Sequence, residues 1–295
     1  MAHTRTHPKS DGLVAFYLLV LTLSFLIGGS MILFQIPGGT VLPGSPLPPV
    51  YGLLLLLIYV FLPSTVGVIM TWRMEGRAGL RTLWRRTTHF RLGLKPLAII
   101  LLLPLGFVAA SIILRLARGG AIATSPLFAS PLLLVGFLVQ VFLFGPLSEE
   151  LGWRGFALDR LLARTTPLKA SLVHGVIWAF WHLPAFFIPG TIQQSWGNPV
   201  LEYSIFACAV ISSSFIFTWL HLNTWRSVWA AILYHTTANL SLNFLQTLYP
   251  VDLPNRILYT LLMGVLPGIL LAFFSLRKKS ISRETNHDTG IEGQL

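Results

Sequence analysis

The sequence predicts an all-α membrane protein, a bundle of about eight transmembrane helices that encloses a polar cavity. Of its 295 residues, 54% are hydrophobic and 11% are charged, whereas a soluble domain carries about 25% charged residues. Several apolar segments reach the roughly 20 residues that a helix needs to cross the hydrocarbon core. The sequence has no series of short alternating strands of the kind that builds outer-membrane barrels. These observations together favour a polytopic helical protein.

Eight apolar segments are the expected spans. They cover residues 13–34, 50–72, 96–116, 127–148, 170–188, 201–221, 227–247 and 256–276. The first segment is longer than the apolar core of a signal peptide, and no small-residue cleavage site follows it, so we interpret it as a span. We therefore divide the chain into an N-terminal tail (1–12), a membrane domain (13–276) and a basic C-terminal tail (277–295).

The positive charge of the chain is confined to loops and tails. Its formal net charge is +11, and because this charge alternates with apolar spans it does not indicate a nucleic-acid-binding surface. If the N-terminus lies inside, 18 of the 21 Lys and Arg residues fall on the cytoplasmic side, the exceptions being Arg115, Arg118 and Arg256. This asymmetry predicts a multi-pass protein of the cell membrane with both termini in the cytoplasm. Residues 77–95 form either an amphipathic helix on anionic lipid or a plain cytoplasmic loop.

Two adjacent carboxylates, Glu149 and Glu150, follow an apolar run without charged side chains. Ionisable groups at membrane depth are costly and are functional candidates for that reason. Adjacent side chains on a helix point about 100° apart, so the two carboxylates are expected to differ in role. Arg154 lies four residues after Glu150, which predicts an ion pair on one helical face. Alternatively, both carboxylates simply cap the cytoplasmic end of a span.

Polar side chains recur in two later spans. His182 lies about twelve residues into its span, or roughly 18 Å from the helix start, with Trp178 one turn before it. His235 and Asn239 are four residues apart and share a helical face. Each could serve only as an interhelical hydrogen-bonding group. Polar sites at related depths on three spans instead predict one shared cavity.

The combined pattern resembles the CPBP family of intramembrane proteases, also called the CAAX-protease and bacteriocin-processing or Abi family. Its first motif, EExxxR, is matched from Glu149 to Arg154, its second, FxxxH, at His182, and its third, HxxxN, from His235 to Asn239. The motifs keep their order and spacing over residues 149–239. The sequence departs from the family pattern at one point, since Trp178 stands where Phe is usual. We expect Trp178 to keep the aromatic wall.

The resemblance implies an intramembrane endopeptidase that hydrolyses a peptide bond of a membrane-anchored peptide or protein near the cytoplasmic face of the bilayer. Glu149 would be the general base that activates water, and His182 would orient or polarise that water. His235 and Asn239 would stabilise the oxyanion of the tetrahedral intermediate. A carboxylate in a low-dielectric cavity and amide or imidazole N–H donors are groups suited to these tasks. The pattern makes no prediction of oligomeric state.

The other motif residues are expected to support the site. Glu150 and Arg154 would hold the first motif in place, and Trp178 would form part of the wall. A divalent metal such as Zn²⁺ is a possible cofactor, because Glu149, His182 and His235 would make the two-His, one-carboxylate set of some catalytic zinc sites. The sequence has no HExxH motif, so the soluble zinc-protease template does not apply.

Two other classes of function remain compatible with the sequence. A non-catalytic immunity or scaffold protein would use the same cavity to bind a peptide, since fold alone does not establish function. A transporter or channel would also carry polar residues inside the membrane. The absence of internal pseudo-symmetry and of matching interrupted helices argues against a transporter.

Overall fold

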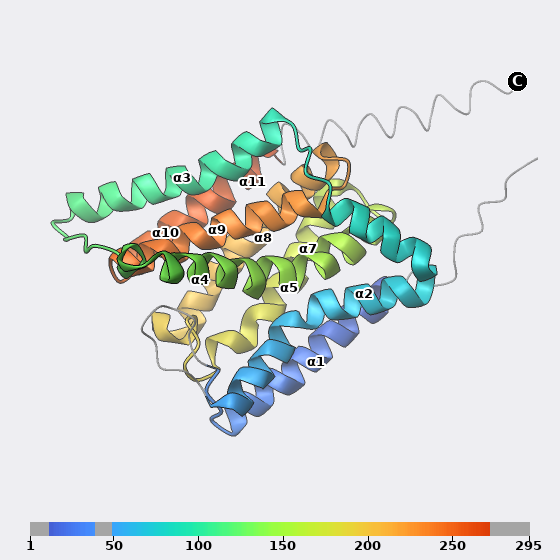
Figure 1. Cartoon of the computed structure of the whole chain (residues 1–295), viewed down its shortest axis with the longest axis horizontal. Coiled ribbons are helices and arrows are strands. Elements are labelled where there is room, and N and C mark those ends of the chain that lie inside the picture. The colour runs from blue at the N-terminus through green and yellow to red at the C-terminus, as the bar shows by residue number, and fades with distance from the viewer. Residues whose placement is uncertain (1–11, 39–48, 272–295) are drawn as a thin grey trace, which may run out of the picture.

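The computed structural model describes residues 12–38 and 49–271, and this part of the chain is a helical bundle that contains no strand. Its elements are α1 (Leu13–Leu33), α2 (Val50–Thr87), α3 (Leu94–Ala117), a 3-10 turn (Pro126–Ala129), α4 (Pro131–Phe142), a π-helical turn (Leu143–Leu147), α5 (Ser148–Gly152), a second π-helical turn (Trp153–Ala157), α6 (Leu158–Leu162), α7 (Pro167–His182), two 3-10 turns (Leu183–Phe186 and Gln194–Trp196), α8 (Pro199–Asn223), α9 (Val228–Leu248), α10 (Leu253–Thr260), a third π-helical turn (Leu261–Val265) and α11 (Leu266–Leu271). Figure 1 shows α3, α9 and α4 running nearly parallel, with α1 and α2 running obliquely below them.

Six helices in the described part of the chain are long and apolar enough to cross a membrane. They cover Leu13–Leu33, Val50–Thr87, Leu94–Ala117, Pro131–Leu162, Pro199–Asn223 and Leu253–Leu271. The remaining two predicted spans are the 16-residue α7 and the 21-residue α9. They fall short because α7 is brief and α9 carries His, Asn, Ser and Thr side chains. The all-α polytopic membrane class is confirmed.

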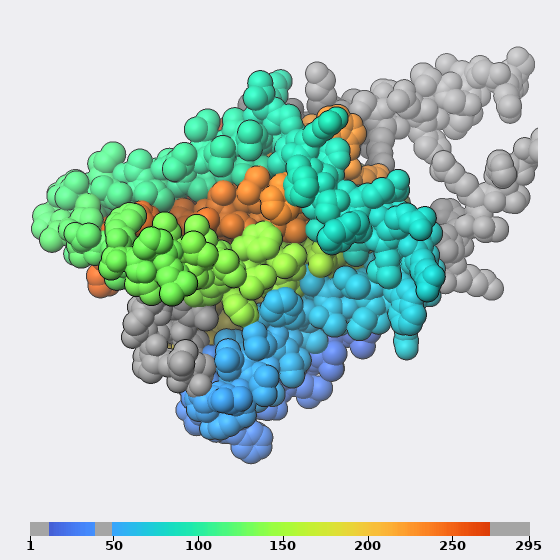
Figure 2. Space-filling model, viewed as in Figure 1, coloured from blue at the N-terminus to red at the C-terminus, as the bar shows by residue number. Residues whose placement is uncertain are grey.

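The predicted tails lie outside the described residues, apart from Gly12. The last residues of the predicted span 256–276 lie outside them as well. The predicted domain boundaries therefore stay predictions. Within the described part, Figure 2 shows α9 at the molecular surface between α3 and α4.

The bundle has two ends with different character. One end, which we call the arginine end, joins the C-terminus of α2 to the loop between α8 and α9 through a bond from Arg86 Nε to the Arg226 carbonyl (2.8 Å). At the opposite, far end, the Gly38 amide donates to the Pro189 carbonyl (2.9 Å). The long helices run between these ends (Figure 1), so each residue can be placed by its distance from one of them.

The C-terminal part of α2 carries the basic segment as a helix rather than a loop. The backbone leaves helical geometry at Gly76 (φ 62°), and the helix continues to Thr87. Leu83 is buried against the bundle, whereas Arg81 and Arg85 are exposed. Up to Thr87 the predicted helix is therefore present, and its contact with anionic lipid stays a prediction.

The long span between α4 and α6 is interrupted directly before the two carboxylates. Phe144 and Gly145 leave helical φ/ψ values, Gly145 at φ 144°, and Pro146 has no amide proton to donate. Ser148 Oγ accepts from the Gly145 amide (2.9 Å) and so closes the interruption. Such π-helical interruptions frequently occur at functional sites. This one aims the backbone and the side chain of Glu149 into the bundle.

Two glycines allow the interrupted span to cross α2 at very short range. A Cβ atom added to Gly152 would lie 2.0 Å from the Pro63 carbonyl oxygen, and one added to Gly67 would lie 2.6 Å from the Cα of Gly152. Membrane helices commonly use such small residues to approach closely. The crossing fixes α5 against the middle of α2.

Candidate functional site

Glu149 is buried, with 4% of its surface exposed, and it lines the main cavity. One carboxylate oxygen, Oε2, accepts hydrogen bonds from the indole nitrogens of Trp178 (2.6 Å) and Trp153 (3.2 Å). Among the described residues no hydrogen bond to Oε1 is found, and this oxygen lies 4.0 Å from a Cβ atom placed on Gly145. The carboxylate therefore has one oxygen fixed by the protein and one directed to the cavity.

The predicted ion pair between Glu150 and Arg154 is present, and His235 joins it. Arg154 Nη1 donates to both carboxylate oxygens (2.9 and 3.1 Å), and both side chains are fully buried. His235 Nδ1 contacts Glu150 Oε1 at 2.8 Å. Since a carboxylate accepts, this ring nitrogen donates and Nε2 is left to face the cavity. Glu150 thus connects the first motif with the third, a link that the sequence spacing did not reveal.

Trp178 lies at the centre of the site. The Arg154 guanidinium packs 4.3 Å from its ring centroid and 3.7 Å from that of Phe217. The ring centroids of His182 and His235 lie 5.9 and 5.6 Å from that of Trp178. The expected aromatic wall is therefore present. Unlike the usual Phe, however, Trp178 also donates a hydrogen bond to the Glu149 carboxylate.

His182 ends α7 at the point where the helix gives way to a 3-10 turn. Its Nδ1 lies 2.9 Å from the Trp178 carbonyl, and because a carbonyl only accepts, this nitrogen carries the proton. Nε2 then has a free lone pair. His182 is half-buried and lines the cavity. It can accept a hydrogen bond from a molecule bound there.

A cavity of about 260 Å³ gathers the predicted residues. Glu149, His182, His235 and Asn239 all line it. Its other lining residues include Tyr59, Val60, Gln140, Phe144, Thr191, Trp196, Phe206, Phe217 and Leu242. Residues of all three motifs therefore line one cavity, although the motifs are separated by up to 90 residues along the chain.

Gly145 is a site residue that the sequence reasoning missed. A Cβ atom at this position would lie 2.9 Å from Asn239 Nδ2 and 3.7 Å from His235 Nε2. Its φ of 144° also favours glycine. The Gly-Pro pair that interrupts the apolar run before Glu149 was the signal available in the sequence. Gly145 keeps these two polar atoms accessible from the cavity.

The cavity extends from the motif residues toward the far end of the bundle. The loop residues Thr191 and Trp196 line it there, as do five residues in the first half of α2, namely Leu53, Leu56, Leu57, Tyr59 and Val60. The charged loops lie at the arginine end. Two predictions therefore conflict. The charge distribution would place the arginine end in the cytoplasm, whereas a site near the cytoplasmic face would place the far end there.

The side chains do not support the predicted metal set. Among the described residues, no group of three or more His, Cys, Asp or Glu side chains could hold a metal ion. Glu149, His182 and His235 each keep one donor atom that is not engaged by their bonds to the indoles, a carbonyl and Glu150, but the three side chains are not grouped as a metal site. The predicted zinc site is therefore not supported, and no step below is derived through a metal.

Comparisons with known proteins agree with the three-motif pattern. Residues 131–241 match the model of the type II CAAX prenyl endopeptidase Rce1-like family. The chain is also similar to CAAX prenyl protease 2 of Methanococcus maripaludis, with 27% identity over 231 residues, which cover 77% of this chain and 83% of that protein. The matched family region contains all three motifs and Gly145.

Proposed function

We propose that the chain is a membrane protease of the CPBP family, an intramembrane endopeptidase that uses Glu149 to activate water. The observation that carries this proposal is the convergence of Glu149, His182, His235 and Asn239 on one cavity. A carboxylate with one fixed and one free oxygen is suited to accept a proton from water in a defined direction.

In the proposed reaction, a water molecule lies between Glu149 Oε1 and His182 Nε2. Glu149 takes one proton as the water oxygen attacks the carbonyl carbon of the peptide bond. The negative charge that develops on the carbonyl oxygen is stabilised by Asn239 Nδ2 and by His235 Nε2. A ring whose Nδ1 donates to a carboxylate can hold a second proton on Nε2, as this role requires. Collapse of the intermediate breaks the C–N bond, and Glu149 returns the proton to the leaving amine.

We propose a membrane-anchored peptide or protein as the substrate class. Much of the cavity wall is apolar, with Val60, Phe144 and Leu242 among its members. The matched family is described as type II CAAX prenyl endopeptidase, and the Methanococcus maripaludis relative is named CAAX prenyl protease 2. Peptides with a lipidated cysteine near the C-terminus are therefore the first substrates to test. Partitioning of a lipid anchor into the bilayer would raise the local concentration of such a peptide.

The orientation of the site in the membrane is a separate part of the proposal. The distribution of Lys and Arg favours a cytoplasmic arginine end, which would make the cavity open toward the lipid or the opposite leaflet. Labelling with a membrane-impermeant maleimide decides this point. In a Cys208→Ser background, Trp225→Cys reports on the arginine end and Thr124→Cys on the far end. Labelling of only Thr124→Cys in intact cells is expected, and labelling of only Trp225→Cys would place the cavity on the cytoplasmic side.

The activity itself is tested with purified protein in liposomes and a panel of membrane-anchored peptides, with and without a prenylated cysteine. The wild type is expected to cleave at least one of them, and Glu149→Gln is expected to lower the rate by about 100-fold or more. Glu75→Gln is the matched control, because Glu75 is half-exposed and lies outside the cavity. A Glu149→Gln rate equal to the wild-type rate would contradict the residue assignment. Binding of peptides without any cleavage would replace the protease with a non-catalytic peptide-binding protein.

A further inference from the structure

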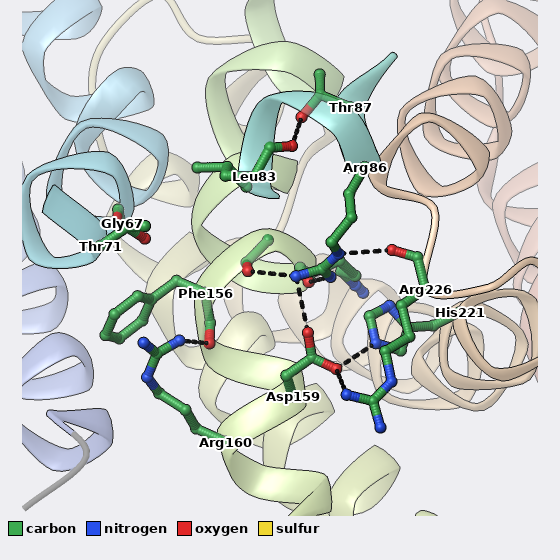
Figure 3. Close-up of polar contacts among 12 residues, drawn as sticks. Gly67, Thr71, Leu83, Arg86, Thr87, Phe156, Asp159, Arg160, His221 and Arg226 are labelled. Carbon is green, nitrogen blue, oxygen red and sulfur yellow. Dashed lines mark hydrogen bonds and ion pairs between the residues drawn. The ribbon is translucent and has the colours of Figure 1, made fainter. Parts of the chain in front are cut away.

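A dense polar network lies at the arginine end, outside the catalytic motifs. Figure 3 shows Arg86 extending from the end of α2 toward Asp159, with Arg226 and His221 on the opposite side of the carboxylate. These residues come from four different elements, namely α2, α6, α8 and the loop before α9. The network therefore ties together parts of the chain that carry the first and third motifs.

Arg86 is the central donor of this network. Its Nε donates to the Arg226 carbonyl (2.8 Å), and its Nη2 donates to the Arg154 carbonyl (2.9 Å). Its Nη1 donates to the Gly155 carbonyl (3.1 Å) and pairs with Asp159 Oδ2 (2.8 Å). With 17% of the side chain exposed, most of the guanidinium is withdrawn from water. All three guanidinium nitrogens thus donate hydrogen bonds to acceptors in the protein.

The first group of acceptors belongs to the motif segment. The carbonyl of Arg154 accepts from Arg86, while the side chain of Arg154 pairs with Glu150. Gly155, the second acceptor, lies in the same π-helical turn, Trp153–Ala157. Arg86 therefore holds the backbone from which the Glu150 partner projects, and it does so from α2.

The second group of contacts fixes the entry into α9. The loop residues Trp225 and Arg226 have positive φ values of 51° and 61°, which are unfavourable for non-glycine residues by about 1–3 kcal/mol each. The Arg226 carbonyl is held by Arg86, and Arg226 Nη1 contacts Asp159 Oδ1 at 3.2 Å. His235 lies two turns beyond the start of α9. The same guanidinium thus fixes the starting point of the helix that presents His235.

Asp159 completes the arrangement as the shared acceptor. It pairs with Arg86 through Oδ2, and through Oδ1 it accepts from His221 Nε2 (2.9 Å) and Arg226. One carboxylate therefore joins α6, α8 and the α8–α9 loop. No atom of this network lines the main cavity.

We propose that Arg86 is a positioning residue for the hydrolysis, which sets the relative placement of the Arg154 backbone and α9 and through them the geometry of Glu150 and His235. This inference rests on the proposed function. A misplacement of about 1 Å in a catalytic arrangement can lower the rate about 100-fold. Arg86 binds both the backbone that follows the first motif and the loop that leads into α9.

The test compares Arg86→Gln and Arg86→Lys with the neighbouring Arg85→Gln. Arg85 is exposed, and the hydrogen bond found for its side chain is a long one to Thr82 (3.5 Å). We expect Arg86→Gln to lower kcat about tenfold or more with KM changed less than about threefold, because the cavity wall is untouched. Arg86→Lys should retain an intermediate kcat, since one ammonium cannot meet four acceptors. Arg85→Gln should stay within about twofold of the wild type.

A second readout keeps the proposal independent of the protease assignment. Hydrogen exchange of the amides in 153–157 and 228–232 is expected to accelerate in Arg86→Gln and not in Arg85→Gln, whether or not a substrate is cleaved. A wild type that cleaves no peptide would overturn the proposed function. The hydrogen-exchange result would still test whether Arg86 fixes the two segments. An unchanged kcat in Arg86→Gln, a kcat loss no larger than the loss of folded protein, or unchanged exchange would overturn the positioning role.

Discussion

Within the described residues, two buried arginine–glutamate pairs differ in how many of the arginine donors have a hydrogen-bond partner. At the far end, Arg256 binds Glu202 with two nitrogens, at 2.7 Å each, and also donates to the carbonyls of Val251 and Trp196. In the site, Arg154 reaches Glu150 with Nη1 alone. Its Nε and Nη2 have no hydrogen-bond partner among the described residues.

The difference shows how a similar pair serves two purposes. Arg256 is saturated with acceptors, as is usual for a buried charge that joins loops. Arg154 is instead enclosed by the rings of Trp178 and Phe217, and its partner Glu150 also accepts from His235. Unsatisfied donors cost stability, and natural proteins tolerate such costs mainly at functional sites. We interpret the Arg256 pair as structural and the Arg154 pair as part of the catalytic geometry.

Removing each acid in turn tests the comparison most strongly. Glu150→Gln is expected to lower the cleavage rate per folded molecule by about 100-fold or more, because His235 loses the carboxylate that holds Nδ1. Glu202→Gln is expected to leave that rate within about threefold and to lower the free energy of unfolding by about 3–5 kcal/mol, the cost of breaking a buried pair. Cleavage assays on quantified folded protein and denaturant unfolding measure the two effects.

The reverse pattern would break the distinction. If Glu202→Gln abolished cleavage in folded protein while Glu150→Gln left it unchanged, the far-end pair would be the functional one.

Packing around the site pair gives the next largest effect. Gly152→Ala places a Cβ atom 2.0 Å from the Pro63 carbonyl oxygen, so α5 has to move away from α2. We expect a loss of about 1–3 kcal/mol or more in unfolding free energy, together with reduced cleavage. Gly136→Ala is the matched control on the same span, since no atom lies within 4 Å of its added Cβ. Equal melting temperatures for the two variants would show that the close crossing is absent.

The hydrogen bonds to Glu149 are expected to have a smaller effect. Trp178→Phe keeps the aromatic wall and removes the 2.6 Å donor. A hydrogen bond to a charged group contributes about 1.5–3 kcal/mol, so kcat is expected to fall about tenfold or more. Trp153→Phe removes the longer 3.2 Å bond and should lower kcat less. A larger loss for Trp153→Phe than for Trp178→Phe would contradict this ranking.

The smallest effect concerns a surface pair at the far end, between Arg118 and Asp252. Burial acts to raise the pKa of the Asp252 carboxyl, but hydrogen bonds from Arg118 and Asn255 outweigh it and hold the pKa below its usual range. Because the folded-state pKa is depressed, the stabilisation is complete above about pH 4, the usual pKa of an unfolded Asp, and is lost as the pH falls through the folded-state pKa.

Asp252→Asn keeps an N-cap for α10 and removes the charge. The variant should lose less melting temperature than the wild type between pH 5 and pH 3. The difference is expected to correspond to less than about 1 kcal/mol, because the Arg118 and Asp252 side chains are 48% and 33% exposed. Identical dependence of the melting temperature on pH in the two proteins would show that the Arg118–Asp252 pair does not contribute to stability.

The sequence predicted the features that repeat along the chain or follow helical spacing. Six of the eight predicted spans follow from their apolar length, and the Glu150–Arg154 pair follows from its i,i+4 spacing. The bond from His235 to Glu150 could not be predicted, because it joins residues 85 positions apart and depends on how α9 packs against α5. The indole bond from Trp178 depends on rotamers and packing in the same way.

The direction of the cavity also required the structure. The span order places His182 at the far end of α7. The Gly-Pro pair before Glu149 signals a break in the helix, but the sequence does not show that this break opens at Gly145 toward the cavity. Likewise, Arg86 looked like one of several arginines in a basic segment. The backbone of α2 leaves helical geometry at Gly76, and the last turn of the helix then packs against the bundle. Only this packing brings Arg86 within hydrogen-bonding distance of the Arg226 carbonyl.

A single-turnover cleavage in H₂¹⁸O tests the central claim, attack by a water molecule that Glu149 activates, most directly. The account predicts one ¹⁸O atom in the new C-terminal carboxylate of the product and none in the Glu149 side chain, as mass spectrometry of both peptides would measure. An unlabelled product together with ¹⁸O in Glu149 would contradict it, because that pattern requires the carboxylate itself to attack the peptide bond.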